Sequence, residues 1–366
     1  GIKNDQFFRN RLTHSLEVAQ IARSIAGTIQ YEQGESYIVE AGALAHDLGN
    51  PPFGHAGERF LNEIFSDIGG FEGNAQTLRI LTSIEKKRPD FRGLNLTYRS
   101  MLSVVKYFNK FDFDKYKEDG KGQKFIYDDD YELLNKFIEE NKVKIRTLDV
   151  QIVDIADEIA YAAHDLEDGL RVKAFTIDEI LHDYKAEYGE SDSYKKFEEN
   201  VKKAQEKAGY GINKLDSTQY SKLFRQELAS RLINLALNDI GLVPVTDEMK
   251  KKTNTTQAEE LGFLKYSELI HGLKDIVFKC INHNDEVYHY EKKGKKVITF
   301  LTDLYQENTL YLPPEYRAKD LISQYPDLKK EDTEKLQKRL ICDYIAGMMD
   351  SYAISTYEKF SGNKFM

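Results

Sequence analysis

The sequence predicts an all-α protein, and three observations bear on that fold class. Only 7 of the 366 residues are Pro, so long stretches lack the residue that most strongly breaks a helix. Apolar residues recur every three or four positions over most of the chain, which is the period of an amphipathic helix. Only residues 292–301 alternate enough, around Gly294, to predict one small β-hairpin.

The first three helices are the most clearly patterned. Residues 11–30 carry an apolar arc broad enough for a well-buried helix, formed by Leu12, Leu16, Ala19, Ala22, Ala26 and Ile29 and widened by Val18, Ile21 and Ile25. The second helix begins at Ser36, a suitable N-cap, and ends where Gly49 precedes Asn50, Pro51 and Pro52. The third opens near His55 and ends at Gly69 and Gly70.

Further helices are expected over residues 74–86, 98–108, 131–141, 148–170 and 220–237. We expect one core from residue 1 to about 240, with the helices of residues 241–366 packed on it. Two stretches rich in charged residues, 110–130 and 183–216, are predicted to be surface insertions without a recognisable chemical motif.

Composition excludes several classes of protein. With 52 Lys plus Arg against 61 Asp plus Glu, the net charge of −9 argues against a dedicated nucleic-acid coat. No apolar run approaches the roughly 20 residues that cross a bilayer, so we expect a cytoplasmic protein with no membrane partner. Only Cys280 and Cys342 are present, so any metal would be held by His and carboxylate groups. The chain opens with Gly1 rather than Met, and we expect a natural N-terminal segment to precede it.

Histidines gather near the start of the chain, where His14, His46 and His55 are three of the eight. His46 and Asp47 end an apolar helix just before a tight turn, a place where ligands can converge. His14 lies on the apolar face of the first predicted helix, so its imidazole needs a partner or a metal. A hydrogen-bonded core histidine stays open as the alternative for His46.

A second cluster lies on one face of the predicted helix 148–170. Its members follow one another at spacings of three, four, three and four: Asp154, Asp157, Tyr161, His164 and Asp168. Asp165 follows Asp157 by eight residues, and the opposite face is apolar. A solvated acidic face is the plain alternative, but the interruption by Tyr161 and His164 favours a site.

His14, His46, Asp47 and Asp157 together resemble the His and Asp set of the HD superfamily of metal-dependent phosphohydrolases. Six segments, in order from Arg9 to about Tyr352, are similar to the deoxyguanosinetriphosphate triphosphohydrolase family. They read RNRLTHSLEVAQIAR, HDLGNPPFGHAGE, FEGNAQTLRIL, GLNLTY, ADEIAYAAHDLEDGL and DYIAGMMDSYA.

This resemblance implies an HD-domain helical core that binds a divalent ion, with manganese or magnesium as the first choices among first-row metals. His14, His46, Asp47 and Asp157 would be its ligands. The family cleaves deoxynucleoside triphosphates (dNTPs) at the α-phosphorus, releasing deoxynucleoside and intact triphosphate. His55 would be the general acid at the 5′ oxygen and Glu58 its orienting partner.

The resemblance also implies substrate contacts. Tyr161 would pack against C2′ of the deoxyribose, and Asp165 would accept a hydrogen bond from the 3′-OH. The other predicted substrate-binding residues are Arg11, Asn50, Asn74 and, as weaker candidates, Arg225 and Arg231. A relative has a lysine where this chain has Glu158, which leaves part of the phosphate clamp unassigned.

Two other classes of function stay open. One is another HD phosphohydrolase, such as a nucleotidase or a cyclic-nucleotide phosphodiesterase. The other is a non-catalytic nucleotide sensor or a single-strand nucleic-acid binder built on the same scaffold. Because homo-oligomers are common in the family, we expect one, and a regulatory dNTP stays open as a second ligand.

Overall fold

The computed structural model describes residues 11–119, 122–209, 216–282, 285–330 and 332–365. It divides into two units, each assembled from separate segments. Unit 1 joins Gly1–Leu44, Thr147–Asp247 and Gln257–Asp285, and unit 2 joins Ala45–Arg146, Glu248–Thr256 and Glu286–Met366. The two units therefore interleave in sequence.

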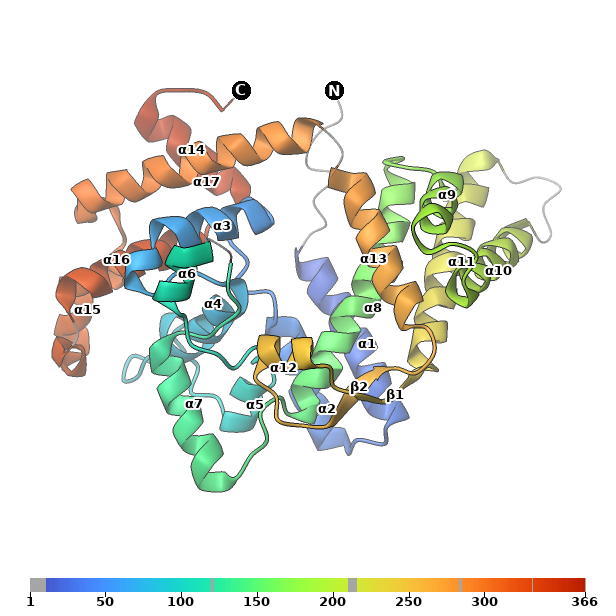
Figure 1. Cartoon of the computed structure of the whole chain (residues 1–366). Coiled ribbons are helices and arrows are strands. Elements are labelled where there is room, and N and C mark those ends of the chain that lie inside the picture. The colour runs from blue at the N-terminus through green and yellow to red at the C-terminus, as the bar shows by residue number, and fades with distance from the viewer. Residues whose placement is uncertain (1–10, 120–121, 210–215, 283–284, 331, 366) are drawn as a thin grey trace. The chain divides into compact units, whose positions relative to one another are not determined.

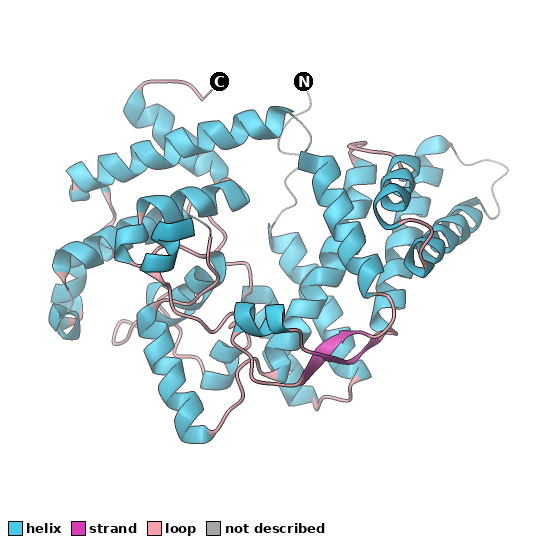
Figure 2. Cartoon of the chain, viewed as in Figure 1, coloured by secondary structure: helices cyan, strands magenta, loops and turns pink. Residues whose placement is uncertain are grey.

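The prediction of an all-α protein is confirmed. Helices dominate the described residues, which contain a single two-stranded sheet (Figure 2). No helix in the described part of the chain is both long and apolar enough to cross a membrane.

Unit 1 is organised around one long helix, α8 (Leu148–Arg171). Three helices pack against it: α1 (Arg11–Thr28), α11 (Ser217–Leu237) and α13 (Ser267–Asn282) (Figure 1). The predicted apolar face of α8 is buried, and none of its members exceeds 7% exposure: Ile152, Ile155, Ile159, Ala163 and Leu166. The remaining helices of the unit are α2 (Gln33–Ala45), α9 (Ile177–Tyr188) and α10 (Asp192–Gly209).

The apolar arc of α1 is narrower than predicted. Val18, Ile21 and Ile25 are buried with His14, as expected for the face that packs on α8. Leu12 and Leu16 were expected to be buried as well, but they are 63% and 54% exposed. The helix covers its neighbour along one side only, so residues at the edge of a broad arc remain in contact with solvent.

The single hairpin lies elsewhere than predicted. Strands β1 (Ile240–Pro244) and β2 (Glu259–Phe263) pair antiparallel, with Ile240 opposite Phe263 and Pro244 opposite Glu259. Residues 292–301 instead belong to helix α14 (Asp285–Glu307). The hairpin prediction for that segment was wrong because its buried residues, Val297, Ile298 and Leu301, follow helical spacing.

The two predicted surface insertions contribute to the interior. In 183–216, Tyr184 and Phe197 are fully buried within the core of unit 1. In 110–130, Phe125 and Ile126 are at most 1% exposed. Both stretches have few apolar residues among many charged ones. Their composition therefore did not indicate that these apolar residues are buried together.

Unit 2 contains the following helices: α3 (Gly54–Ile64), α4 (Gly73–Arg79), α5 (Tyr98–Leu102), α6 (Phe113–Asp119), α7 (Asp128–Asn141), α12 (Asp247–Thr253), α14, α15 (Ala318–Gln324), α16 (Thr333–Ala346) and α17 (Asp350–Ser361). The first residues of α12 and α14 belong to unit 1. One apolar cluster joins α3 to α14, α16 and α17, and another gathers around α4, α5 and α7.

A buried ion pair connects α4 with α16. Arg79 Nη2 lies 2.7 Å from Asp343 Oδ2, its Nε lies 2.9 Å from Oδ1, and Gln76 Nε2 donates to the same Oδ1 at 3.0 Å. The fork geometry of the guanidinium suits such a bidentate contact. Two of the six segments that carry the family resemblance therefore meet in the interior of unit 2.

Candidate active site

In unit 1, helix packing brings together two predicted metal ligands that are 143 residues apart. His14 Nε2 on α1 lies 3.0 Å from Asp157 Oδ1 on α8. The side chains of His14 and Asp157 are 6% and 14% exposed, respectively. An imidazole nitrogen and a carboxylate oxygen at this separation can share a proton or bind the same cation, and this mixed N and O pair suits first-row divalent metals.

Tyr161 lies directly beside this pair. Its ring centroid is 4.8 Å from that of His14, and the two rings are tilted by 45°. Lys274 on α13 places Nζ 5.5 Å from the centroid of the Tyr161 ring. Among the described residues no carboxylate oxygen lies within 4.0 Å of this ammonium. Unit 1 thus offers a nitrogen and an oxygen donor side by side, an aromatic surface and a cation in contact with that surface.

Glu158, the position where a relative has lysine, is paired with a histidine of α13. His271 Nε2 lies 2.5 Å from Glu158 Oε2, and this hydrogen bond raises the pKa of His271 despite its partial burial. Asp165 is half-buried one turn beyond Tyr161 on α8, where the sugar contact was expected.

In unit 2, His46 and Asp47 lie on a turn fixed by backbone contacts. Thr77 Oγ1 donates to the carbonyl oxygen of His46 at 3.0 Å and accepts from the N–H of Gly49 at 2.9 Å. A Cβ at Gly49 would lie 2.1 Å from the carbonyl oxygen of Gly73 and 2.3 Å from the nitrogen of Thr77. Only glycine fits this close approach. His46 Nε2 is 3.5 Å from Asp47 Oδ1.

The predicted acid and its partner lie at the start of α3. His55 Nδ1 is 3.6 Å from Glu58 Oε2, and the His55 side chain is 77% exposed. Lys124 Nζ lies 3.2 Å from the other oxygen of Glu58. Burial would raise the pKa of Glu58, but the hydrogen bond from His55 and the charge of Lys124 lower it to about 2. Glu58 is therefore a carboxylate at neutral pH.

Lys124 and Glu72 belong to this cluster, although sequence analysis did not single them out. Lys124 Nζ also lies 2.7 Å from Glu72 Oε1, and the two carboxylates raise the pKa of this lysine against the effect of its burial. Glu72 caps α4 by accepting from the N–H of Ala75 at 2.9 Å, and glutamate is not one of the usual N-cap residues that a sequence would have indicated. No local pattern distinguishes Lys124 from its charged neighbours.

The two predicted asparagines lie in the same part of unit 2. Asn74 Nδ2 donates to Glu72 Oε1 at 2.8 Å. Asn50 follows the turn, and a Cβ at Gly73 would lie 3.2 Å from its Oδ1. Both amides therefore lie at the start of α4.

Of the three predicted arginines, the structure describes the side chains of Arg225 and Arg231 only. Arg11 is the first residue of α1, and its side chain lies outside the described residues. On α11, Arg225 Nη1 donates to Ser221 Oγ at 2.6 Å, and Arg231 Nε lies 2.8 Å from Glu227 Oε1. Both contacts are between neighbours one turn apart on the same helix.

Two protein families match separate parts of the chain. The HD domain family matches residues 11–162, and the phosphohydrolase-associated domain matches residues 265–359. A deoxyguanosinetriphosphate triphosphohydrolase-like protein 2 of Vibrio cholerae is 39% identical over 99% of this chain and 82% of its own length. The chain belongs to the deoxyguanosinetriphosphate triphosphohydrolase family of HD-domain proteins.

Two further relatives carry the name deoxyguanosinetriphosphate triphosphohydrolase-like protein. The protein of Aliivibrio fischeri is 31% identical over 98% of this chain and 86% of its own length. That of Leptospira interrogans is 32% identical over 96% of this chain and 80% of its own length. The resemblance predicted from the motifs is confirmed, and the chain is a hydrolase of the metal-dependent HD phosphohydrolase class.

Proposed function

We propose that the protein hydrolyses dNTPs at the α-phosphorus, giving deoxynucleoside and inorganic triphosphate. One observation carries the proposal: the ring of Tyr161 packs on His14, which itself contacts Asp157. A metal-ligand pair with an aromatic side chain against it suits a phosphate ester whose sugar lies beside the reacting phosphorus. The names of the relatives agree with this substrate class.

We assign His14, His46, Asp47 and Asp157 as ligands of one divalent ion, manganese or magnesium. All four lie within the HD match, and the His14 and Asp157 donors of unit 1 are of the type that such ions accept. The ion would lower the pKa of a bound water and polarise the phosphoryl group. With these four residues as ligands of one ion, we expect one divalent ion per chain.

His55 is proposed to donate a proton to the 5′ oxygen as it leaves. A sugar alkoxide is a poor leaving group, so general acid catalysis here is typically worth about 10²- to 10⁴-fold in rate. The ionised Glu58 orients the imidazole and stabilises its protonated form. Lys124 in turn lowers the pKa of Glu58 and so keeps this carboxylate ionised beside His55. The lysine also contributes a positive charge near His55.

Substrate recognition is proposed to use the following side chains. Tyr161 would leave no space for a 2′-OH, and Asp165 would accept from the 3′-OH. A triphosphate carries up to about four negative charges, which cations must balance. Lys274 lies against the ring of Tyr161 and Lys124 beside Glu58, whereas Arg225 and Arg231 contact neighbours on their own helix, so we propose the two lysines as these cations. Arg11, Asn50 and Asn74 remain proposed substrate contacts.

The decisive experiment is product analysis of dGTP incubated with the protein and Mn²⁺ in isotopically labelled water. We expect deoxyguanosine and inorganic triphosphate, with the label on the triphosphate because water attacks phosphorus. Monophosphate with pyrophosphate, or label in the nucleoside, would refute the assigned bond cleavage. A panel of the four dNTPs, alone and in mixtures, then reports base preference and any activation by a second nucleotide.

Two substitutions on α8 separate the metal site from the rest of its acidic face. Asp157→Ala is expected to abolish metal binding and turnover. Asp168→Ala is the matched control, because this carboxylate contacts Arg171 on the exposed surface of the same helix. Metal analysis of the two purified variants measures their metal content, and an activity assay measures their turnover. Full metal content in Asp157→Ala would remove this residue from the proposed ligands.

Tyr161→Ala tests the steric gate against ribonucleotides. We expect the preference for dGTP over GTP to fall by about 10- to 100-fold, since the packing that excludes one hydroxyl is worth a few kcal/mol at most. An unchanged preference would place the gate elsewhere.

Activity on dGMP or a cyclic nucleotide in place of dGTP would favour another HD phosphohydrolase. Salt-sensitive binding of single strands without turnover would favour the non-catalytic alternative.

Location and assembly complete the proposal. We propose that the protein is cytoplasmic and forms a homo-oligomer. Light scattering on the full chain, with and without dNTP, measures the oligomer and shows whether nucleotide changes it.

A further inference from the structure

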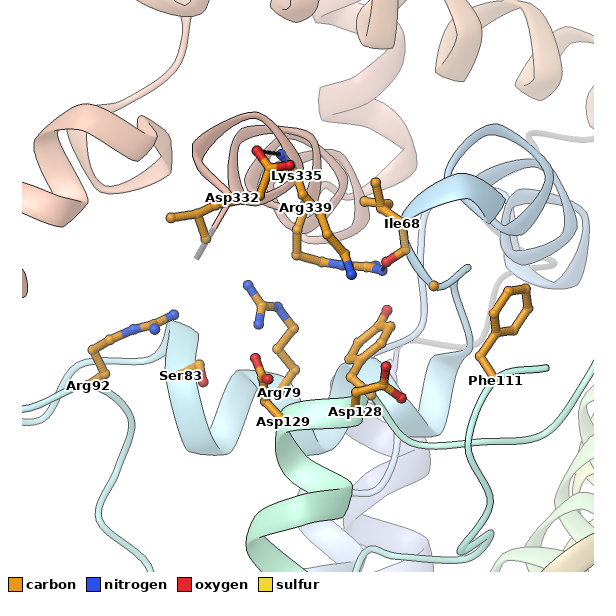
Figure 3. A pocket seen from close by; sticks show the side chains of 13 residues that line it. Ile68, Arg79, Ser83, Arg92, Phe111, Asp128, Asp129, Asp332, Lys335 and Arg339 are labelled. Atoms are coloured by element: carbon orange, nitrogen blue, oxygen red, sulfur yellow. Dashed lines mark hydrogen bonds between the residues drawn. The ribbon is translucent and has the colours of Figure 1, made fainter. Parts of the chain in front are cut away.

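Unit 2 contains a pocket that none of the proposed active-site residues lines. Its volume is about 360 Å³, and it lies between the end of α4, the start of α7 and one side of α16 (Figure 3). Pockets that bind small molecules typically measure about 300–1,000 Å³. The pocket is therefore large enough for an oligophosphate or a small phosphorylated molecule.

Two buried arginines form the inner wall of this pocket. Arg79 and Arg339 are each 8% exposed. Arg79 is neutralised by Asp343, as described above. The guanidinium carbon of Arg339 lies 4.3 Å from the centroid of the Tyr127 ring, and its two terminal nitrogens donate to the carbonyl oxygens of Gly70 and Ile68 at 2.9 and 3.0 Å.

Arg339 lacks a direct anionic partner within the described residues, because no carboxylate oxygen there lies within 4.0 Å of its guanidinium. The described partners of Arg339 are two carbonyl groups, the Sγ of Cys342 at 3.9 Å and an aromatic ring, and a buried cation with such uncharged partners keeps part of its desolvation cost. An anion that entered the pocket would lower this cost. The arrangement therefore favours a negatively charged ligand.

Further cationic groups line the same space. Figure 3 shows Arg79 and Arg92 directed toward it from below, with Arg339 across its upper side. Lys335, one turn before Arg339 on α16, is the fourth cation. Guanidinium groups that approach from different elements suit phosphate, because each carries five N–H donors and the contacts described for Arg79 and Arg339 use only some of them.

Three carboxylates also border the pocket, but their placement leaves its interior cationic. Asp332 caps α16 by accepting from the N–H of Glu334 at 2.9 Å, so its charge stabilises the helix start. Asp128 and Asp129 are exposed, where water screens their charge. Both arginines of the inner wall are buried, and their attraction for an anion is screened less.

We propose that this pocket binds the oligophosphate group of a free inorganic oligophosphate or of a nucleotide. The two inner-wall arginines, Arg79 and Arg339, would contact the phosphate oxygens together with Arg92, and Ser83 offers a hydroxyl donor. Phe111, at the edge of the pocket, offers a ring on which a base can stack if the ligand is a nucleotide. The proposal does not depend on the proposed hydrolytic function, since none of its residues belongs to that site.

Calorimetric titration of the full chain with inorganic triphosphate, in EDTA, tests the proposal without turnover. We expect saturable binding near one equivalent per chain. Arg92→Ala and Lys335→Ala should each weaken it by about 10-fold or more, since a hydrogen bond to a charged group is worth about 1.5–3 kcal/mol. Arg339→Lys keeps the charge but loses the fork, and it should weaken binding as well.

Two control variants locate the binding. Lys338→Ala removes a lysine of the same helix that contacts Asp67 outside the pocket, and it should bind like the wild type. Lys124→Ala removes the lysine of the candidate active site and should also retain binding. Loss of binding in Lys124→Ala alone, wild-type affinity in all pocket variants, or absence of binding would each overturn the proposal. Circular dichroism confirms that each variant is folded.

The source of the phosphate group is decided by a second titration, with dNTPs in EDTA on the Lys124→Ala variant. Tighter binding of a dNTP than of inorganic triphosphate, reduced to the inorganic value by Phe111→Ala, identifies a nucleotide ligand. Equal affinities identify the oligophosphate alone.

Discussion

The two groups of candidate active-site residues are held in place by different means. In unit 1, His14, Asp157 and Tyr161 project from two regular helices, and their positions follow from the apolar packing of α1 on α8. In unit 2, His46 and Asp47 lie on a turn whose backbone touches the backbone of α4. The first group depends on side-chain volume, whereas the second depends on the absence of a side chain at Gly49.

This difference determines how each region should respond to substitution. A packed helix pair loses stability when a core side chain is shortened, but the helices still present the same faces. A turn built on close backbone approach cannot accept an added atom without moving the residues that it carries. Four substitutions test the contrast.

Gly49→Ala is expected to have the largest effect. The new Cβ would meet backbone atoms at 2.1 and 2.3 Å, so the turn that carries His46 must shift. We expect a loss of about 3 kcal/mol or more in the free energy of unfolding, and a loss of metal binding in the protein that still folds. Urea unfolding and metal analysis measure the two effects. Unchanged metal content would show that the turn accommodates the extra atom.

Ile159→Ala changes the packing of the other region. Ile159 is fully buried on α8, two residues from Asp157. We expect the free energy of unfolding to fall by about 2–5 kcal/mol, while the folded protein keeps its metal and its turnover number. Loss of metal in fully folded Ile159→Ala would mean that the ligand positions in unit 1 are as sensitive to packing as the turn in unit 2.

Asp130→Asn tests a buried carboxyl of α7. Asp130 accepts from Thr82 Oγ1 at 2.8 Å, and burial raises its pKa to about 6, above the ordinary 3.8. Between these values the unfolded chain releases the proton and the folded protein keeps it, so stability from this group falls as the pH rises. Relative to the wild type, Asp130→Asn should gain up to about 3 kcal/mol between about pH 4 and pH 7.

Urea unfolding at the two ends of this pH range measures the gain of Asp130→Asn. The exposed neighbour provides the control, because Asp129→Asn should show no comparable change with pH. A constant difference between Asp130→Asn and wild type would show that this carboxyl is ionised at the same pH in both states.

Gly27→Ala is expected to have the smallest effect and the opposite sign. A Cβ at Gly27 in α1 would meet no atom within 4 Å. Alanine restricts the unfolded chain and favours the helix, so the free energy of unfolding should rise by about 0.4–1 kcal/mol. Thermal unfolding measures it. A decrease would show that α1 needs a flexible residue there, contrary to the packing account of unit 1.

Several features were predictable because they are local. The apolar face of α8 follows from helical spacing, and His55 and Glu58 are neighbours because they are three positions apart at a helix start. Composition alone did not indicate the contacts of residues 110–130, which were predicted to be a surface insertion. This stretch contains the buried Phe125, and its Lys124 lies 3.2 Å from Glu58.

The sequence alone determined the class of helical fold, the family and the residue types of the proposed chemistry, because periodicity and motifs are properties of short segments. The tertiary structure decided which residues meet across long separations: Asp157 with His14, Asp343 with Arg79, and Lys274 with Tyr161. Such contacts depend on how helices pack, and packing is set by the fit of whole faces. A single charged residue in the sequence carries no sign of the distant group that it will contact.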